Sequence, residues 1–188
     1  MEKINSLTGM TDLIETKADE NVLANKVFQT EKILKEIFTN YAMSEIRTPA
    51  LENTNLFKRS VGDTSDIVNK ELYTFSDKND KSITLRPEGT ASVMRSIIEK
   101  KLDGETHKLW YLGPMWRYER PQKGRYRQFN QAGIEILGYP EGAPEFEMIS
   151  LICELNRKLQ IRKPLIKINH LGDSNTKKLF CKALVDLS

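Results

Sequence analysis

The sequence predicts an α+β fold in which an antiparallel β-sheet is flanked by helices. Helical and strand-like patterns are mixed along the chain without regular alternation, which favours this class over a parallel α/β sheet. The chain has 188 residues, of which 39% are hydrophobic and 29% charged. This length suits one domain, and the composition excludes disordered and fibrous classes. No apolar run approaches the roughly 18 residues of a membrane span.

Helical periodicity of apolar residues occurs in four segments. The longest runs from Asn21 to Tyr41, and Pro49 argues against its continuation. A second pattern opens at Gly89-Thr90 and ends near Leu102. Apolar residues from Phe146 to Leu159 predict a third helix, and residues 173–187 predict a fourth.

Strands are predicted where β-branched and aromatic residues gather between turn signals. The polar segment 120–126 contains Pro121 and Gly124 and cannot be regular throughout, so a hairpin with a long basic loop is expected there. The predicted strands are 44–51, 68–75, 83–85, 108–112, 115–119, 127–137 and 165–168.

The net charge of +3 is concentrated in the predicted hairpin. From Arg117 to Arg127 there are five basic residues and one acidic residue, a local charge of +4, so the rest of the chain sums to −1. One cationic loop on a nearly neutral background points to an anionic ligand at a particular place rather than to general adhesion to nucleic acid or membrane. A solvated basic turn is the alternative interpretation.

The strand after this loop has two chemically different faces, because side chains alternate across a strand. One face carries a cation, an aromatic ring, an amide, a glycine that lets another group approach the backbone, and a carboxylate. These groups suit a phosphorylated, base-containing ligand beside a small polar molecule. The polar face consists of Arg127, Phe129, Gln131, Gly133 and Glu135, and the predicted core face of Asn130, Ala132, Ile134 and Ile136.

A second polar cluster, residues 86–90, lies at a predicted strand-to-helix junction, where backbone N–H groups and side chains can line a pocket. Alternatives stay open here. Glu88 and Thr90 fit the start of a helix, and Phe129 fits a core ring.

These residues resemble a known enzyme family. Trp116-Arg117-Tyr118-Glu119, followed by Arg125 and the strand through Glu135, resembles motif 2 of the class II aminoacyl-tRNA synthetases. The helix ending near Tyr41, with the strand to Pro49, resembles motif 1. Residues 85–91, 113–115 and 119–131 are similar to the histidyl-tRNA synthetase family in particular.

The resemblance implies a reaction in which histidine and ATP form histidyl-adenylate, followed by transfer of the histidyl group to tRNA. Arg117 would be the catalytic cation where the histidine carboxylate meets the α-phosphate, and it therefore belongs to both substrate sites. By the same resemblance ATP is bound with Mg²⁺. The implied ATP-binding residues are Arg117, Glu119, Arg125 and Phe129, with Arg125 at the outer phosphates and Phe129 stacked on adenine.

For histidine, the resemblance implies that Glu88, Thr90 and Gln131 hold the α-ammonium group and that Glu135 accepts an imidazole N–H. The implied contacts to the acceptor end of tRNA are Gln122, Lys123 and Arg127. No metal site of the chain's own is expected. His107 and His170 are expected in ordinary surface or core roles.

Residues 1–188 are expected to be the amino-terminal part of a class II catalytic domain, with motif 3 and the anticodon-binding domain absent. The resemblance to motif 1 implies a homodimer. The amino terminus has no secretory signal, so a cytoplasmic protein is expected. Two alternatives remain: a noncatalytic, histidine-binding regulatory paralogue that acts through a histidine-biosynthesis enzyme, and an inactive dimerisation module.

Overall fold

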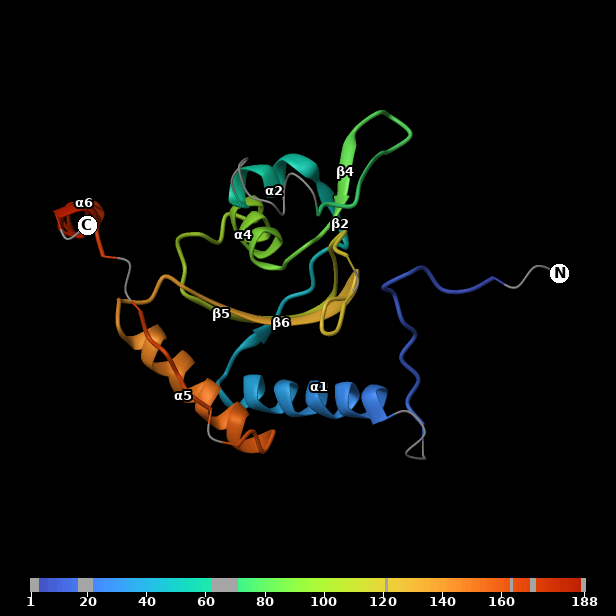
Figure 1. Cartoon of the computed structure of the whole chain (residues 1–188), viewed down its shortest axis with the longest axis horizontal. Coiled ribbons are helices and arrows are strands. Elements are labelled where there is room, and N and C mark those ends of the chain that lie inside the picture. Colours follow the sequence, from blue (N-terminus) through green and yellow to red (C-terminus); the bar gives the residue numbers. More distant parts are fainter. Residues whose placement is uncertain are drawn as a thin grey trace.

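Two long antiparallel strands, β5 and β6, form the centre of the fold, and helices lie on both of their faces (Figure 1). The computed structural model describes residues 4–16, 22–61, 71–120, 122–162, 164–169 and 172–186. Its elements are α1 (Val22–Asn40), β1 (Ser44–Glu45), β2 (Leu51–Asn53), α2 (Thr54–Val61), β3 (Thr74–Ser76), β4 (Ser82–Leu85), α4 (Thr90–Glu99), β5 (His107–Trp116), β6 (Gln128–Leu137), α5 (Ala143–Lys158) and α6 (Ser174–Asp186).

The described strands form two three-stranded sheets. In the first, β5 pairs with β6 over ten residues, and the short β1 joins the other edge of β5 in parallel. In the second, β4 lies between β2 and β3, and both pairings are antiparallel. The prediction of antiparallel sheets flanked by helices is confirmed, with β1 as a parallel exception.

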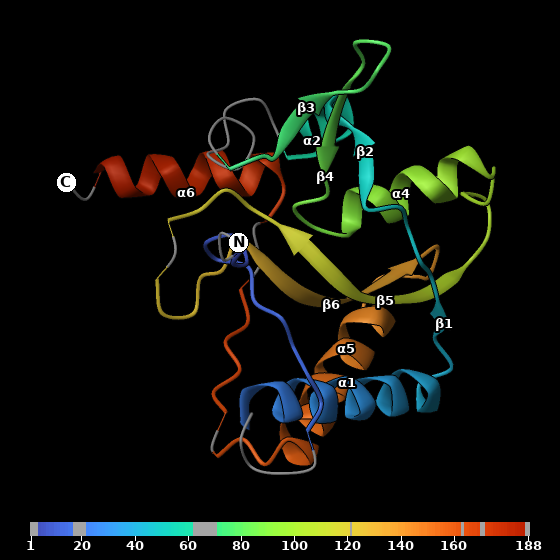
Figure 2. The same cartoon turned by 90° about the vertical axis from the view of Figure 1, so that its right-hand side faces the viewer.

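A separate apolar layer lies on each face of the β5–β6 pair. Helices α1 and α5 lie on one face (Figure 2). They pack over Trp110, whose ring centroid lies 5.2 Å from that of Phe38. On the other face α4 packs over Tyr111 and Met115 through Val93 and Ile97. Alternation along β5 therefore sends neighbouring aromatic residues into opposite layers.

The predicted core face of β6 is confirmed for half of its members. Ile134 and Ile136 pack against the layer beneath α1 and α5. Asn130 and Ala132 are exposed on the same face, nearer the start of the strand. The core therefore occupies only one end of this face.

Several predicted elements were wrong in extent. The strand predicted over 44–51 is divided into β1 and β2, because Pro49 has no N–H for a ladder. The segments 108–112 and 115–119 are one continuous strand that ends at Trp116. Residues 165–168 form no strand, and helix α2 was not predicted. Of the strand predicted over 68–75, residues 68–70 lie outside the described part of the chain.

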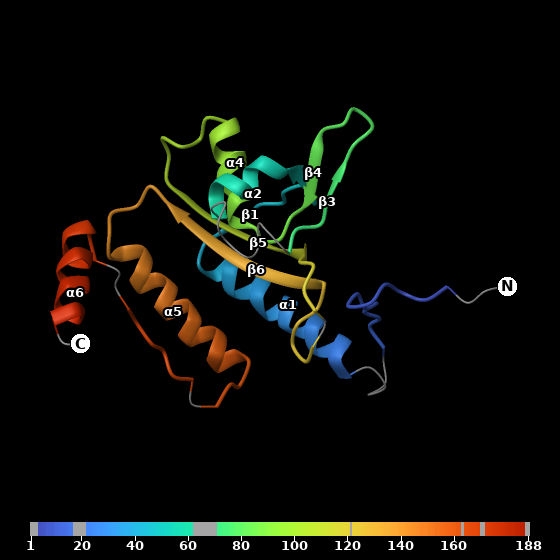
Figure 3. The same ribbon diagram turned by 45° about the horizontal axis from the view of Figure 1, so that its top comes forward.

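The four predicted helices are present, but their apolar faces differ from the prediction in α5 and α6. In α5, Leu151 is buried and Leu155 packs beside it, whereas Phe146 points to solvent. Helix α6 stands apart from the β5–β6 layers (Figure 3), and its Leu179 and Phe180 are exposed. In the described residues we find no helix whose length and apolar character would let it cross a bilayer.

Replacing Ile37 by Ala should lower the free energy of unfolding by about 2–5 kcal/mol, because Ile37 is 0% exposed and its truncation leaves a cavity between α1 and the sheet. Ile98→Ala is the matched control, because Ile98 is also helical but 62% exposed, and its effect should stay within about 0.5 kcal/mol. Urea unfolding of both variants measures the difference. Equal losses would contradict the assignment of Ile37 to the core.

Candidate active site

The junction between β4 and α4 is fixed by the side chain of Arg86. Its Nη1 donates to the Thr48 carbonyl at 2.8 Å and to Thr48 Oγ1 at 2.9 Å, and its Nε donates to the Pro114 carbonyl at 3.2 Å. Burial lowers the pKa of this guanidinium, an effect that Glu52 and Tyr111 oppose. Because the three bonds span two separate segments, they hold residues 87–89 at a defined place above β5.

Glu88 and Thr90 lie at the start of α4. The Glu88 carboxylate accepts hydrogen bonds from the backbone N–H of Thr90 at 2.6 Å and of Ala91 at 3.0 Å. The helix-start interpretation of Glu88 is therefore realised. Each carboxylate oxygen keeps a second acceptor position, so capping does not exclude ligand binding.

Thr90 also connects α4 to β6. Its Oγ1 donates to Glu135 Oε1 at 2.7 Å, although the two residues are 45 positions apart in sequence. Burial raises the pKa of Glu135, and the negative charge of Glu88 adds to this rise, while the hydrogen bond from Thr90 opposes it. Two carboxylates and a hydroxyl thus lie in one place, which suits a ligand with several N–H donors.

Arg117 follows β5 and turns back toward this cluster. Its Nε donates to the Pro87 carbonyl at 3.0 Å, and its guanidinium carbon lies 5.1 Å from the centroid of the Phe129 ring. Phe129 also packs against the layer beneath α4, so the core interpretation of this ring is confirmed. Gln131, two residues further on the same face, has a buried Oε1 with no hydrogen-bond partner in the described residues.

The tip of the basic loop is a tight turn. Arg125 N donates to the Gln122 carbonyl at 2.9 Å, and the reverse bond measures 3.2 Å. Gln122, Lys123 and Arg125 are exposed, and Arg125 Nη1 lies 3.4 Å from Glu119 Oε2. The cationic groups at the tip are therefore available to an anionic ligand.

Arg127 occupies a different position, at the base of the loop. Its guanidinium carbon lies 4.4 Å from the Tyr118 ring centroid, and its Nε donates to the Glu119 carbonyl at 3.3 Å. The structure therefore does not bring Arg127 together with Gln122 and Lys123, although all three were predicted as one group.

A turn near the amino terminus supports the base of the basic loop. The Gly9 carbonyl accepts hydrogen bonds from Arg127 N at 2.8 Å and from Gln128 N at 3.1 Å. Gly9 has a φ of +80°, and a methyl group on it would lie 2.9 Å from Arg127 Cγ, so both conformation and space favour glycine. We did not predict this contact, and a lone glycine gave no signal for it.

The structure brings most of the predicted residues together on the α4 side of β5–β6. Tyr111 was missed, and Arg86 was predicted only as a member of the polar cluster 86–90, without its role in holding the junction. The alternation of side chains along its strand could have identified Tyr111, because it places this residue on the same face as Gly113 and Met115. His107 has a structural role, because its Nε2 lies within hydrogen-bond distance, 2.8 Å, of the Leu102 carbonyl oxygen. His170 lies outside the described residues.

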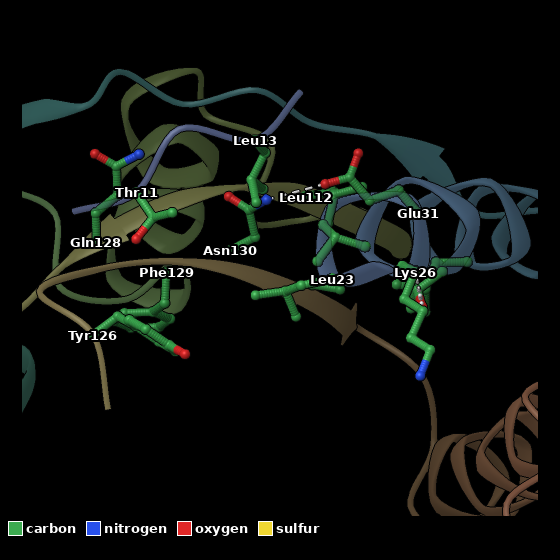
Figure 4. A pocket seen from close by; sticks show the side chains of 14 residues that line it. Thr11, Leu13, Leu23, Lys26, Glu31, Leu112, Tyr126, Gln128, Phe129 and Asn130 are labelled. Atoms are coloured by element: carbon green, nitrogen blue, oxygen red, sulfur yellow. Dashed lines mark hydrogen bonds between the residues drawn. The ribbon is translucent and has the colours of Figure 1, made fainter. Parts of the chain in front are cut away.

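A cavity of about 450 Å³ lies on the opposite face, between α1, the amino-terminal segment and β6 (Figure 4). Leu13 and Leu23 give it an apolar wall, and Asn130 Nδ2 donates to Glu31 Oε1 at 3.1 Å on its rim. Of the predicted site residues that are described, it contains only Phe129.

The fold, with antiparallel sheets flanked by helices, is that of a class II aminoacyl-tRNA synthetase catalytic core. The model of the family described as histidyl-tRNA synthetase matches residues 20–174. The chain belongs to this family.

Individual proteins agree with this assignment. The chain is 48% identical over 158 residues to a histidine–tRNA ligase of Geobacter sulfurreducens, covering 83% of this chain and 38% of that protein. It is 45% identical over 186 residues to a histidine–tRNA ligase of Prochlorococcus marinus, covering 98% and 42%. The chain thus spans about two fifths of the length of these curated relatives.

Among solved structures, apo histidyl-tRNA synthetase of S. aureus superposes with a TM-score of 0.77 at 36% identity, covering 98% of this chain and 42% of that one. A Bacillus halodurans protein described as an ATP phosphoribosyltransferase regulatory subunit/histidyl-tRNA synthetase gives a TM-score of 0.64 at 22% identity, which shows the fold alone. The similarity to ligases does not favour the regulatory alternative.

Glu135→Gln should increase the free energy of unfolding relative to the original chain, and the increase should grow as pH rises from about 4 to 7. A raised carboxyl pKa means that the folded state binds the proton more tightly, so the contribution is present at low pH and is lost as pH rises through the folded pKa. Urea unfolding at several pH values measures it. Glu105→Gln, at an exposed carboxylate, is the control, and a gain for Glu135→Gln that is largest at low pH would contradict the prediction.

Proposed function

We propose that this chain is the amino-terminal part of the catalytic domain of a longer protein that ligates histidine to tRNA, using ATP, in the cytoplasm. The observation that carries the proposal is the meeting of Thr90, Glu135 and Arg117 around the start of α4. A site for histidine and a site for the reacting phosphate then share one wall.

The activation step joins two anions. The histidine carboxylate must attack the α-phosphorus of ATP, and pyrophosphate leaves. A fixed cation reduces the repulsion and stabilises the charge that develops in the transition state. Arg117 fits this role because the Pro87 carbonyl and the Phe129 ring hold its guanidinium before the substrates arrive.

Histidine recognition uses the cluster of acceptors on α4 and β6. The α-ammonium group would donate to Glu88, to Thr90 and to the unpaired Oε1 of Gln131. The imidazole N–H would donate to the Glu135 carboxylate. An apolar amino acid would leave this half-buried carboxylate without a partner, which is the basis for its rejection.

ATP would lie along Phe129 and the basic loop. Phe129 offers a stacking surface for adenine, and Arg125 offers an exposed cation to the outer phosphates. Glu119 lies beside Arg125 and completes this end of the site. Within the described residues no three His, Cys, Asp or Glu side chains gather as a metal-ligand set. Mg²⁺ would enter bound to ATP, because this ion is usually held by substrate phosphates together with one or two carboxylates.

The acceptor end of tRNA would meet the exposed tip of the basic loop, through Gln122 and Lys123. Arg127 would act indirectly, by supporting the loop, because its guanidinium is held by the Tyr118 ring and the Glu119 carbonyl. Contacts of this kind to phosphates weaken as salt concentration rises.

Replacing Arg117 by Ala should reduce histidine-dependent exchange of pyrophosphate into ATP by about 10²- to 10⁴-fold, the range for loss of one group that stabilises transition-state charge. The assay uses the whole protein encoded by the reading frame that contains this chain. Arg47→Ala is the matched control, because Arg47 is an exposed arginine paired only with Glu45 in the described structure, and its rate should be unchanged.

An unchanged rate in Arg117→Ala would remove Arg117 from the catalytic role. Histidine binding without any exchange by the unsubstituted protein would support the regulatory alternative. A dimer that binds neither histidine nor ATP would support the inactive dimerisation module.

We also propose a homodimer that buries the α1 side of the molecule. Leu23 is 57% exposed at the start of α1 and borders the apolar cavity of Figure 4, so a second copy would remove this surface from water. Leu23→Asp should weaken the dimer at least tenfold, the effect of about 1.4 kcal/mol, without weakening α1, since an acidic side chain is favourable in the first turn of a helix.

Sedimentation equilibrium at micromolar concentration measures this association. Ile98→Asp is the control, because it adds the same charge at an exposed residue on the other face of the sheet. A monomeric unsubstituted protein, or equal weakening by both variants, would contradict this interface.

A further inference from the structure

The ring of Tyr111 fills the space between two glycines that lie on different elements. Gly89 immediately precedes α4, and Gly133 lies opposite Tyr111 in the β5–β6 register. A methyl group on Gly89 would lie 2.7 Å from the Tyr111 hydroxyl oxygen, and one on Gly133 would lie 2.7 Å from its Cε1, with other ring atoms closer still in both cases. No side chain larger than hydrogen fits at either position while the ring is in place.

These glycines are adjacent to the two halves of the histidine site. Gly89 is flanked by Glu88 and Thr90, and Gly133 lies between Gln131 and Glu135 on the same face of β6. The ring therefore touches the backbone of both halves at once. The space that the ring occupies sets how far α4 stands from β6, and at the observed separation Thr90 Oγ1 and Glu135 Oε1 are 2.7 Å apart.

We propose that Tyr111 is a positioning residue for histidine recognition: its ring, seated between Gly89 and Gly133, fixes the distance between the histidine acceptors before and in α4 and those on β6. The inference rests on the proposed function, because it assigns those acceptors to histidine. It explains why Gly133 lacks a side chain. The group that approaches its backbone is Tyr111.

The chemistry around the ring explains why it is aromatic. Tyr111 is 7% exposed, and its hydroxyl lies within the electrostatic influence of two carboxylates, Glu88 and Glu135, and of the Arg86 guanidinium. A charged side chain here would repel or neutralise one of these groups, and a flexible aliphatic chain would not hold a fixed thickness. Burial also raises the pKa of the Tyr111 hydroxyl, so the ring stays neutral at physiological pH.

The test compares Tyr111→Leu with Tyr111→Phe in the whole protein, through the kinetics of histidine-dependent pyrophosphate exchange. Tyr111→Leu should raise KM for histidine by about tenfold or more while KM for ATP stays within about twofold, because only the histidine site spans the ring. Tyr111→Phe keeps the ring and should restore KM for histidine to within about threefold of the original.

Two further variants separate positioning from general stability. Gly133→Ala keeps Tyr111 but displaces its ring, and should also raise KM for histidine, so the test survives if Tyr111→Leu does not fold. Phe38→Leu makes a similar loss in the other apolar layer, where Phe38 is 3% exposed, and should leave both KM values unchanged.

Equal increases in KM for histidine in Phe38→Leu and Tyr111→Leu would overturn the inference, as would an unchanged KM for histidine in Gly133→Ala. Absence of histidine-dependent exchange in the unsubstituted protein would instead contradict the proposed function, and the two failures are therefore distinct.

Discussion

The ten-residue pairing of β5 with β6 is the constraint on which the rest of this structure depends. Because side chains alternate along both strands, one register assigns Trp110, Ile134 and Ile136 to the layer under α1 and α5, and Tyr111 and Phe129 to the layer under α4. A slip of one residue would exchange these layers and move the carboxylate of Glu135 away from Thr90. The core and the site are therefore specified by the same set of hydrogen bonds.

Several residues of the site also have structural partners. Glu88 caps α4, Thr90 joins α4 to β6, and Arg117 bonds to a backbone carbonyl. These contacts keep the polar groups in fixed places without a ligand. They also limit the conformational entropy that a ligand would have to overcome, which is the general advantage of a preorganised site.

The sequence supported the parts of this description that depend on local pattern. Alternation along residues 127–137 separated Ile134 and Ile136 from the polar face, and Pro and Gly located the basic loop. The roles of Arg86, Tyr111 and Gly9 could not be predicted in this way, because each depends on contacts between segments that are distant along the chain. Helix α2 was missed because an eight-residue helix has little periodicity to detect.

The basic loop shows most clearly what the sequence pattern alone could not predict. Lys123 and Arg127 belong to one cationic group in sequence, yet the hairpin geometry leaves Lys123 exposed to solvent and turns Arg127 inward onto Tyr118. Charge counting located the cationic residues in the hairpin. It could not distinguish a cation that supports the loop from one that is free to meet a ligand.

The double hydrogen bond to the Gly9 carbonyl joins the beginning of the chain to the proposed nucleotide site. The two donors are the backbone N–H groups of Arg127 and Gln128 at the base of the basic loop, so removing the first ten residues would take a hydrogen-bond acceptor away from both. The amino-terminal segment thus supports the hairpin through main-chain hydrogen bonds. Trimming, tagging or chemically modifying this segment therefore affects the loop, although the two lie about 120 residues apart in sequence. The effect acts through main-chain atoms, so no side-chain substitution in the loop would reveal it.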